Sequence, residues 1–257
     1  MGTIGWLVQQ SCVVMPHTAY CFSRLHAQRL VAAGYSGTPV ILPGLYAGPI
    51  DPTPAEDVDP GLVVYAGRHV QEKRVDQLVR GFARARERSP GLRLELYGDG
   101  PVRPHVEELA GSLGLDSVVV FHGRRPEDEV AKTIARAACL VTASEREGYG
   151  LVVVEAAAHG TPSVVVAGPE NAATELVLDG VNGVISPDAS AKSLAAAIER
   201  VIEAGPTLRE SSAAWFAENA PTLRIDRSLE IVTHTYARVL NRATAARGSR
   251  ARRSGPP

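Results

Sequence analysis

Glu147 and Glu155, eight residues apart, stand in the stretch EREGYGLVVVEAAAHGTPSVV together with Gly148 and Gly150. The glycines let the backbone turn and approach a ligand without a Cβ in the way. A helix expected over Leu151 to Ala158 would offer its first N–H groups to an anion. If the whole stretch were helical, about 12 Å would separate the carboxylates, a reach that suits both ends of a sugar diphosphate. The alternative is that Glu147 is a solvated loop charge and that the helix dipole favours Glu155.

A pair of cations follows the apolar run at residues 62–66. In GRHVQEKRVD, Gly67 permits a sharp turn, Arg68 can form forked hydrogen bonds to phosphate oxygens, and Lys73 adds a mobile positive charge. Two cations beside a helix start are what a diphosphate leaving group needs. The alternative is a solvated basic helix start whose charges are balanced by Glu72 and Asp76.

Two further loops follow apolar runs and are expected at the same edge of the fold. In YGDGP, glycines on both sides of Asp99 form a tight turn, and we favour that turn over a ligand contact by Asp99. In HGRRPEDE, the backbone at Arg124 can lie against the edge of a base. His122 is interpreted as a strand-end packing residue in preference to a catalytic base. The histidines show no metal-ligand spacing, so no metal site is predicted.

The composition is that of a globular chain of 257 residues, with 27 basic and 28 acidic residues and a net charge of −1. This balance predicts no nucleic-acid partner and at most a peripheral association with membranes. No apolar run reaches the roughly 18 residues of a membrane span, and no basic region of a signal peptide is present, so a cytoplasmic location is predicted. Three cysteines without metal-ligand spacing are expected to be buried apolar residues: Cys12, Cys21 and Cys139.

From Gly61 onward, short apolar runs alternate with helical patterns. This alternation predicts an α/β fold, a Rossmann-like doubly wound parallel sheet with helices on both faces, whose ligands bind at the carboxyl ends of the strands. The expected strands are Leu62–Ala66, Leu92–Tyr97, Val118–Phe121, Leu140–Thr142, Ser163–Val166 and Gly183–Ile185. The expected helices are Val75–Arg88, Val102–Leu113, Glu127–Arg136, Leu151–Ala158, Ala172–Leu178 and Ala191–Glu203.

Composition shifts divide the chain into four predicted segments. The first ends in the polar, proline-rich stretch DPTPAEDVDP, and within it we expect a helix over Tyr20 to Ala33 and a strand over Pro39 to Leu42. The segments are residues 1–58, an N-terminal remnant; residues 59–205, the domain of alternating strands and helices; residues 206–243, C-terminal helices; and residues 244–257, a disordered basic tail.

The motifs, taken in order, resemble the nucleotide-binding half of GT-B glycosyltransferases of the large retaining family four. The resemblance rests on GR followed by Lys73, on YGDGP, on FHG and above all on SEREGYGLVVVEAAAHGTPSVV, and it runs from about Gly61 to Ala204. No G-x-S-x-G elbow, P-loop or G-x-G-x-x-G fingerprint supports a hydrolase, an NTPase or a nicotinamide enzyme. The resemblance implies transfer of a sugar from a nucleotide-diphosphate sugar to an acceptor hydroxyl, with retention and without a metal or other cofactor.

The resemblance also assigns roles to residues of this chain. It implies that Arg68 and Lys73, after the turn at Gly67, hold the donor diphosphate, and that Glu147 contacts hydroxyls of the donor sugar. Arg68, Lys73 and Glu147 are therefore the candidate catalytic residues. The other donor-binding candidates are Tyr149, Gly150 and Leu151 through their backbones, Glu155 at the ribose, and Arg124 through its backbone at the base.

The N-terminal part departs from the family. Members of the family have a full N-terminal acceptor domain, whereas YCFSRLHAQRLVAAGYSGTPVILPGLYAG resembles only the last helix and strand of such a domain. The turn PGLYAG also lacks the usual Asn-Gly-hydrophobic-Asp. Two functions therefore stay open: a retaining glycosyltransferase whose acceptor domain lies elsewhere, for example on a separate chain, and a non-catalytic nucleotide-sugar-binding or partner subunit. The sequence names neither the sugar, the base nor the acceptor.

Overall fold

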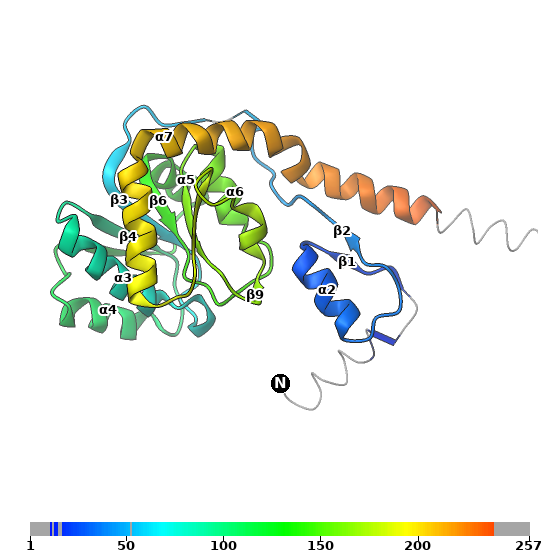
Figure 1. The fold of residues 1–257 in the computed structure, drawn as a ribbon, viewed down its shortest axis with the longest axis horizontal. Helices are drawn as coiled ribbons and strands as arrows, with labels where there is room; N and C mark the ends of the chain where they lie inside the picture. Colours follow the sequence, from blue (N-terminus) through cyan, green and yellow to red (C-terminus); the bar gives the residue numbers. More distant parts are fainter. Residues whose placement is uncertain (1–10, 12, 15–16, 52, 239–257) are drawn as a thin grey trace, which may run out of the picture.

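The computed structural model describes residues 11, 13–14, 17–51 and 53–238, and its centre is a six-stranded parallel sheet (Figure 1). The strands lie in the order β10-β8-β6-β3-β4-β5. Their bounds are β3 (Asp59–Ala66), β4 (Arg93–Tyr97), β5 (Val119–Gly123), β6 (Ala137–Val141), β8 (Ser163–Val166) and β10 (Gly183–Ser186). Each strand overlaps one predicted apolar run, so the predicted doubly wound α/β fold is confirmed.

Helices cover both faces of this sheet. Successive residues of a strand point to opposite faces, and both sets of β3 are buried. Val63 and Tyr65 pack in one apolar cluster with α3, α4 and α7, whereas Leu62 and Val64 pack in another with α5 and α6. The helices are α3 (Val75–Arg88), α4 (Arg103–Ser112), α5 (Glu127–Arg136), α6 (Leu151–Ala158) and α7 (Ala191–Leu223).

The order of the strands places a crevice between β3 and β6. From β3 the chain continues to β4 and β5 on one side of the sheet, and β6, β8 and β10 lie on the other side. The loops after β3 and β6 therefore diverge at the carboxyl edge, which is where doubly wound sheets bind ligands. The loop after β3 contains Gly67 and Arg68, and the loop after β6 leads to Glu147.

The C-terminal helices extend beyond the sheet (Figure 1). The backbone of α7 is broken at Gly205, where φ is 51° and ψ is −132°, close to the predicted helix end at Glu203. The second part of α7 packs Phe216 and Ala220 in a cluster with α6. Residues 225–238 are helical again. Residues 239–243 of the predicted C-terminal helices and the predicted tail, residues 244–257, lie outside the described residues.

The N-terminal segment consists of β1 (Tyr20–Cys21), α2 (Arg24–Ala32) and β2 (Val40–Ile41). The helix predicted over Tyr20 to Ala33 is wrong at its start, because Tyr20 and Cys21 pair with β2. The helix begins after Ser23, whose hydroxyl accepts a hydrogen bond from the His26 N–H at 3.1 Å. The predicted strand near residues 39–42 is confirmed by β2.

Two predictions around the last strands need correction. The helix predicted over Ala172 to Leu178 is a shorter 3₁₀ helix, η2 (Ala172–Leu176), and the side chains of Asn171 and Asn182 accept hydrogen bonds from the N–H groups of Ala173 and Leu178. The stretch before α6 is also not helical. It contains β7 (Arg146–Glu147), which pairs with β9 (Glu170–Asn171), so the 12 Å helical separation does not apply.

The cysteines behave as predicted where the structure describes them. Cys21 and Cys139 are free and buried, and burial raises the pKa of both thiols, that of Cys139 to about 12. Cys12 lies outside the described residues.

Candidate functional site

The candidate site lies at the carboxyl edge of the sheet, where a cation and an acid from distant parts of the chain form an ion pair. Lys73 ends the short helix η1 (Gln71–Lys73), and its Nζ contacts Oε2 of Glu147 in β7. Both side chains are mostly buried, with 16% and 21% of their surface exposed. The sequence predicted that each residue contacts a donor, but it did not predict that they contact one another.

Arg68 follows the same strand as Lys73, and the buried side chain of Tyr65 contacts its backbone. The Tyr65 hydroxyl donates a hydrogen bond to the carbonyl oxygen of Arg68 at 2.8 Å. Burial raises the pKa of Tyr65, the charge of Glu147 raises it further, and the charge of Arg68 lowers it, so both charges act on one hydroxyl. Three residues that the sequence proposed as catalytic therefore converge on one place.

Glycines hold the loops after β3 and β4 against each other. A Cβ on Gly98 would lie 1.9 Å from the carbonyl oxygen of Gly67, and Gly98 has a φ of +108°. A Cβ on Gly67 would lie 2.9 Å from the Tyr65 hydroxyl. The backbone next to Arg68 therefore has no room for a side chain at either position. Asp99 accepts a hydrogen bond from the Gly100 N–H at 2.7 Å, which agrees with the predicted turn.

The start of α6 faces the same edge. Gly150 precedes the helix with a φ of +100°, and Leu151 is the first helical residue. The ring of Tyr149 is buried, and its hydroxyl donates to the carbonyl oxygen of Pro43 at 2.9 Å. The side chain of Tyr149 therefore anchors the N-terminal segment, while the first N–H groups of α6 carry the positive end of the helix dipole.

Glu155 lies farther along α6 and lines a cavity of about 440 Å³. The cavity lies between α5, α6 and residues 45–53, and Glu127 also lines it. Burial, followed by the negative charge of Glu127, raises the pKa of the Glu155 carboxyl. Among the described residues, the Glu155 side chain has no hydrogen-bond or ion-pair partner, so its oxygens are available to hydroxyl donors of a ligand.

A second cavity, of about 380 Å³, lies between the loop that contains Arg68 and the predicted base loop at Arg124. Gly67, Arg68 and Arg124 line it, and Val130 of α5 lines both this cavity and the one that contains Glu155. The two cavities are therefore neighbours on either side of Val130. Together they extend from Arg68, after β3, to Glu155 on α6.

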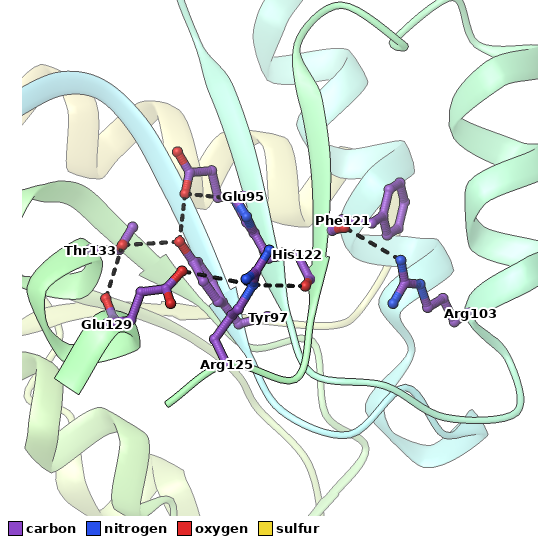
Figure 2. A network of polar contacts seen from close by, with 8 residues as sticks. All are labelled: Glu95, Tyr97, Arg103, Phe121, His122, Arg125, Glu129 and Thr133. Carbon is purple, nitrogen blue, oxygen red and sulfur yellow. Dashed lines mark hydrogen bonds and ion pairs between the residues drawn. The ribbon is translucent and has the colours of Figure 1, made fainter. Parts of the chain in front are cut away.

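A network of polar contacts shapes the wall of the second cavity (Figure 2). The rings of Tyr97 and His122 are stacked, with centroids 4.5 Å apart and planes at 11°. The Tyr97 hydroxyl donates to Glu95 at 2.8 Å, and it lies 3.0 Å from the hydroxyl of Thr133 in α5. Burial raises the pKa of Tyr97 to about 12, so this donor stays protonated. His122 packs on Tyr97, as the sequence predicted, and the network ties α5 to the sheet.

Three contributors to this geometry were not found in the sequence. Tyr65 reads as an ordinary buried strand residue, Glu127 stands at the first position of a predicted helix, and Asn171 directly precedes another predicted helix. A signal existed for Glu127, since it follows Arg124 by three residues at the same strand end. No such signal marks Tyr65 or Asn171, because their neighbours come from distant parts of the chain.

Solved structures share this fold. Sucrose-phosphate synthase of Thermosynechococcus elongatus superposes with a TM-score of 0.80 and 20% identity over 93% of this chain and 62% of that one. HepE of Anabaena in complex with UDP and glucose superposes with a TM-score of 0.74 and 20% identity over 90% and 66%. The fold is therefore the Rossmann-like half of a GT-B protein.

The sequence comparisons then identify the family. The family described as Glycosyl transferases group 1 matches residues 50–221, and the chain belongs to it. The alpha-D-kanosaminyltransferase of Streptomyces kanamyceticus is 32% identical over 165 residues, which are 64% of this chain and 41% of that protein. The chain thus spans less than half the length of this curated relative.

The described part of the chain has neither a cluster of metal-binding side chains nor a membrane-spanning helix. Within it, no group of three or more His, Cys, Asp or Glu side chains is placed to hold a metal ion. No helix in the described ranges combines the length and the apolar character that crossing a bilayer requires.

Proposed function

We propose that this chain binds a nucleotide-diphosphate sugar and acts as the donor-binding half of a retaining glycosyltransferase. The observation that carries the proposal is one arrangement: the Lys73–Glu147 pair lies at the edge of the sheet where Arg68 lines one cavity and Glu155, which has no side-chain partner among the described residues, lines the neighbouring cavity. Membership of the glycosyltransferase family supports the same conclusion.

The cations act on the leaving group in this proposal. Cleavage of the bond between the sugar and the diphosphate leaves the bonding electrons on the diphosphate, and Arg68 and Lys73 stabilise that charge. Lys73 is held by Glu147 before the donor binds, so a diphosphate oxygen can share its ammonium group while Glu147 accepts hydrogen bonds from the sugar. We propose that no metal is needed, because these two cations supply the positive charge.

The nucleoside occupies the two neighbouring cavities in this proposal. Glu155 accepts hydrogen bonds from the ribose hydroxyls, and the backbone at Arg124 contacts the base. The backbones of Tyr149, Gly150 and Leu151 bind phosphate or sugar oxygens at the amino end of α6. HepE, which shares the fold, was solved with UDP and glucose, and this supports a nucleotide as the ligand class.

Transfer needs an acceptor, for which this chain offers no assigned site. Because the chain spans 41% of the kanosaminyltransferase, we propose that the acceptor is held by another part of the protein or by a separate chain. The alternative is a subunit that binds the nucleotide sugar without transferring it. Retention of configuration follows the resemblance to family four and is part of the proposal.

Calorimetry with UDP-, GDP-, ADP- and dTDP-sugars tests the proposal. We expect at least one of these donors to bind, and Arg68→Ala to abolish binding while an exposed control, Arg84→Ala, retains it. Absence of binding by all four donors would contradict the proposal. Slow hydrolysis of the bound donor in the presence of EDTA, with the anomer of the released sugar followed by NMR, separates a metal-independent retaining enzyme from a binding subunit.

A further inference from the structure

We propose that Asn171 is a positioning residue that sets the place of both Glu147 and the amino end of α6. The inference rests on the proposed function, since it assigns Asn171 a part in the same donor site. It concerns a side chain that is not expected to touch the donor and that acts through its neighbours.

The side chain of Asn171 joins three segments at the carboxyl edge of the sheet. Its Nδ2 donates to the carbonyl oxygens of Ser144 at 3.0 Å and Val166 at 2.8 Å, and its Oδ1 accepts from the Ala173 N–H at 3.1 Å. The loop after β6, the end of β8 and the start of η2 are therefore held by one amide. Asn171 is fully buried, so water cannot replace these hydrogen bonds.

The first connection runs from Asn171 to Glu147. Asn171 belongs to β9, which pairs with β7 in a register that places Asn171 opposite Glu147. Each of these strands has only two residues, so this ladder has little stability of its own. The hydrogen bonds of Asn171 to Ser144 and Val166 therefore determine where β9 lies and, through it, where Glu147 meets Lys73.

The second connection runs from Asn171 through Ala173 to Gly150. A Cβ on Gly150 would lie 2.7 Å from the Cβ of Ala173, so the start of η2 packs directly against the turn into α6. The N–H of Ala173 is bonded to the Asn171 side chain. A shift of Ala173 would therefore displace the first N–H groups of α6. One buried amide thus positions an acid and an anion-binding helix end together.

Asn182 provides a matched control within the same fold. It is also buried, and its side chain forms two hydrogen bonds to backbone groups: the Leu178 N–H donates to Oδ1 at 2.7 Å, and Nδ2 donates to the Leu176 carbonyl oxygen at 2.8 Å. Its carbonyl oxygen accepts from the Ser163 N–H, at the amino end of β8. Asn182 therefore has the same chemistry at the other end of η2, where its side chain bonds neither the loop after β6 nor the end of β8.

Hydrogen exchange of Asn171→Asp and Asn182→Asp tests the positioning without any ligand. A carboxylate at either position cannot donate to the carbonyl oxygens that the amide now bonds. We expect amide exchange in residues 145–152 to rise at least about tenfold in Asn171→Asp only, because a lost buried hydrogen bond opens the structure locally. Unchanged exchange in residues 145–152, or an equal rise in Asn182→Asp, would overturn the inference.

Calorimetry with UDP, GDP, ADP, dTDP and inorganic diphosphate then connects the positioning to the donor. We expect Asn171→Asp to weaken binding about tenfold and Asn182→Asp to leave it within about twofold, at similar melting temperatures. Equal affinities in wild type and Asn171→Asp would overturn the inference. If wild type binds none of these ligands, the proposed function fails, and the exchange experiment still decides whether Asn171 positions the loop. Asn171→Ser replaces Asn171→Asp in both experiments if the latter does not fold.

Discussion

Lys73 and Arg209 are two partly buried cations that lie at opposite edges of the sheet and are bound in different ways. Lys73, at the carboxyl edge, pairs with the side chain of Glu147. Arg209, in α7, contacts the amino edge and donates to the carbonyl oxygens of Ala137 at 2.8 Å and His159 at 3.0 Å. It also bonds the carbonyl oxygen of Ala135. Burial lowers the pKa of Arg209.

This difference indicates which of the two cations is available to a ligand. The partners of Arg209 are three backbone carbonyls near the carboxyl ends of α5 and α6, where a cation also offsets the helix dipoles, together with the Thr161 hydroxyl at 3.1 Å. These carbonyl oxygens cannot move away from Arg209 unless the ends of the two helices unwind. The partner of Lys73 is a carboxylate on a flexible side chain, which can move when an anion competes for the ammonium group. We therefore interpret Arg209 as a structural cation and Lys73 as a functional one.

The largest expected effect is on stability. Arg209→Met should lower the free energy of unfolding by about 3 kcal/mol, because it leaves several buried carbonyl oxygens without donors. Urea denaturation measures the loss. Arg88→Met, whose parent side chain is 76% exposed and pairs with Glu199, is the control and should change stability by less than about 0.5 kcal/mol. If Arg209→Met lowers the free energy of unfolding by less than about 1 kcal/mol, Arg209 does not differ from Lys73 as a structural cation.

The next effect is on binding. Lys73→Ala should weaken the affinity for inorganic diphosphate and for the preferred nucleotide sugar about thirtyfold, because a charge-assisted hydrogen bond of about 2 kcal/mol is lost. Calorimetry measures both affinities. Lys132→Ala removes an exposed lysine that also faces a carboxylate, Asp128 at 3.5 Å, and should leave both affinities unchanged. If the two variants bind equally well, Lys73 is as structural as Arg209.

The smallest effect concerns Glu155, an acid without a partner among the described residues. Burial and the charge of Glu127 raise its pKa, so the folded state holds this proton more tightly than the unfolded state does. Stability should therefore fall as the pH rises from the ordinary value of 4.5 through the raised pKa. Above the raised pKa the carboxylate opposes folding, and there Glu155→Gln should melt at a temperature no lower than that of wild type.

Whereas Glu155→Gln should not lower the stability, it should lower the affinity for nucleotides. Glu155→Gln should bind nucleoside diphosphates about tenfold more weakly, because a charged acceptor for the ribose hydroxyls is lost, while its affinity for inorganic diphosphate stays the same. Melting curves at pH 4 to 8 and calorimetry check the two parts. Glu218→Gln, at an exposed position of α7, is the control. A Glu155→Gln protein that is less stable and binds nucleotides normally would show that Glu155 is a structural acid.

Much of the fold of residues 59–205 could be predicted, because residue patterns within short stretches of the sequence mark its strands and helices. In the run VVYAG no polar residues alternate with the apolar ones, which predicts that helices cover both faces of the strand. The strand is β3, in the interior of the sheet. Glycine is also a local signal for the end of a helix, and Gly114 and Gly160 adopt a positive φ after α4 and α6. The helix over Tyr20 and the helix after Ala172 failed, because side chains and a distant strand took the hydrogen bonds that a helix would have used.

The sequence predicted where the candidate residues lie on the sheet, but it did not predict their contacts. Arg68, Lys73 and Glu147 were chosen by type and by their place after strands, which places them at one edge of a parallel sheet. That Lys73 binds Glu147 directly, 74 positions away, depends on how η1 and β7 fold over the edge. The role that we propose for Asn171 has the same origin, since its three partners come from separate segments.

By itself, the sequence determined the alternation of strands and helices, the order of the loops along the chain, and the kinds of charge that each loop carries. These properties follow from apolar periodicity and residue type, which are local. Only the tertiary structure decided that Lys73 meets an acid and Arg209 meets carbonyls, since both are cations preceding or within helices in the sequence. The physical reason is that the packing of one segment against another determines which group a charged side chain contacts, and neither segment alone specifies that packing.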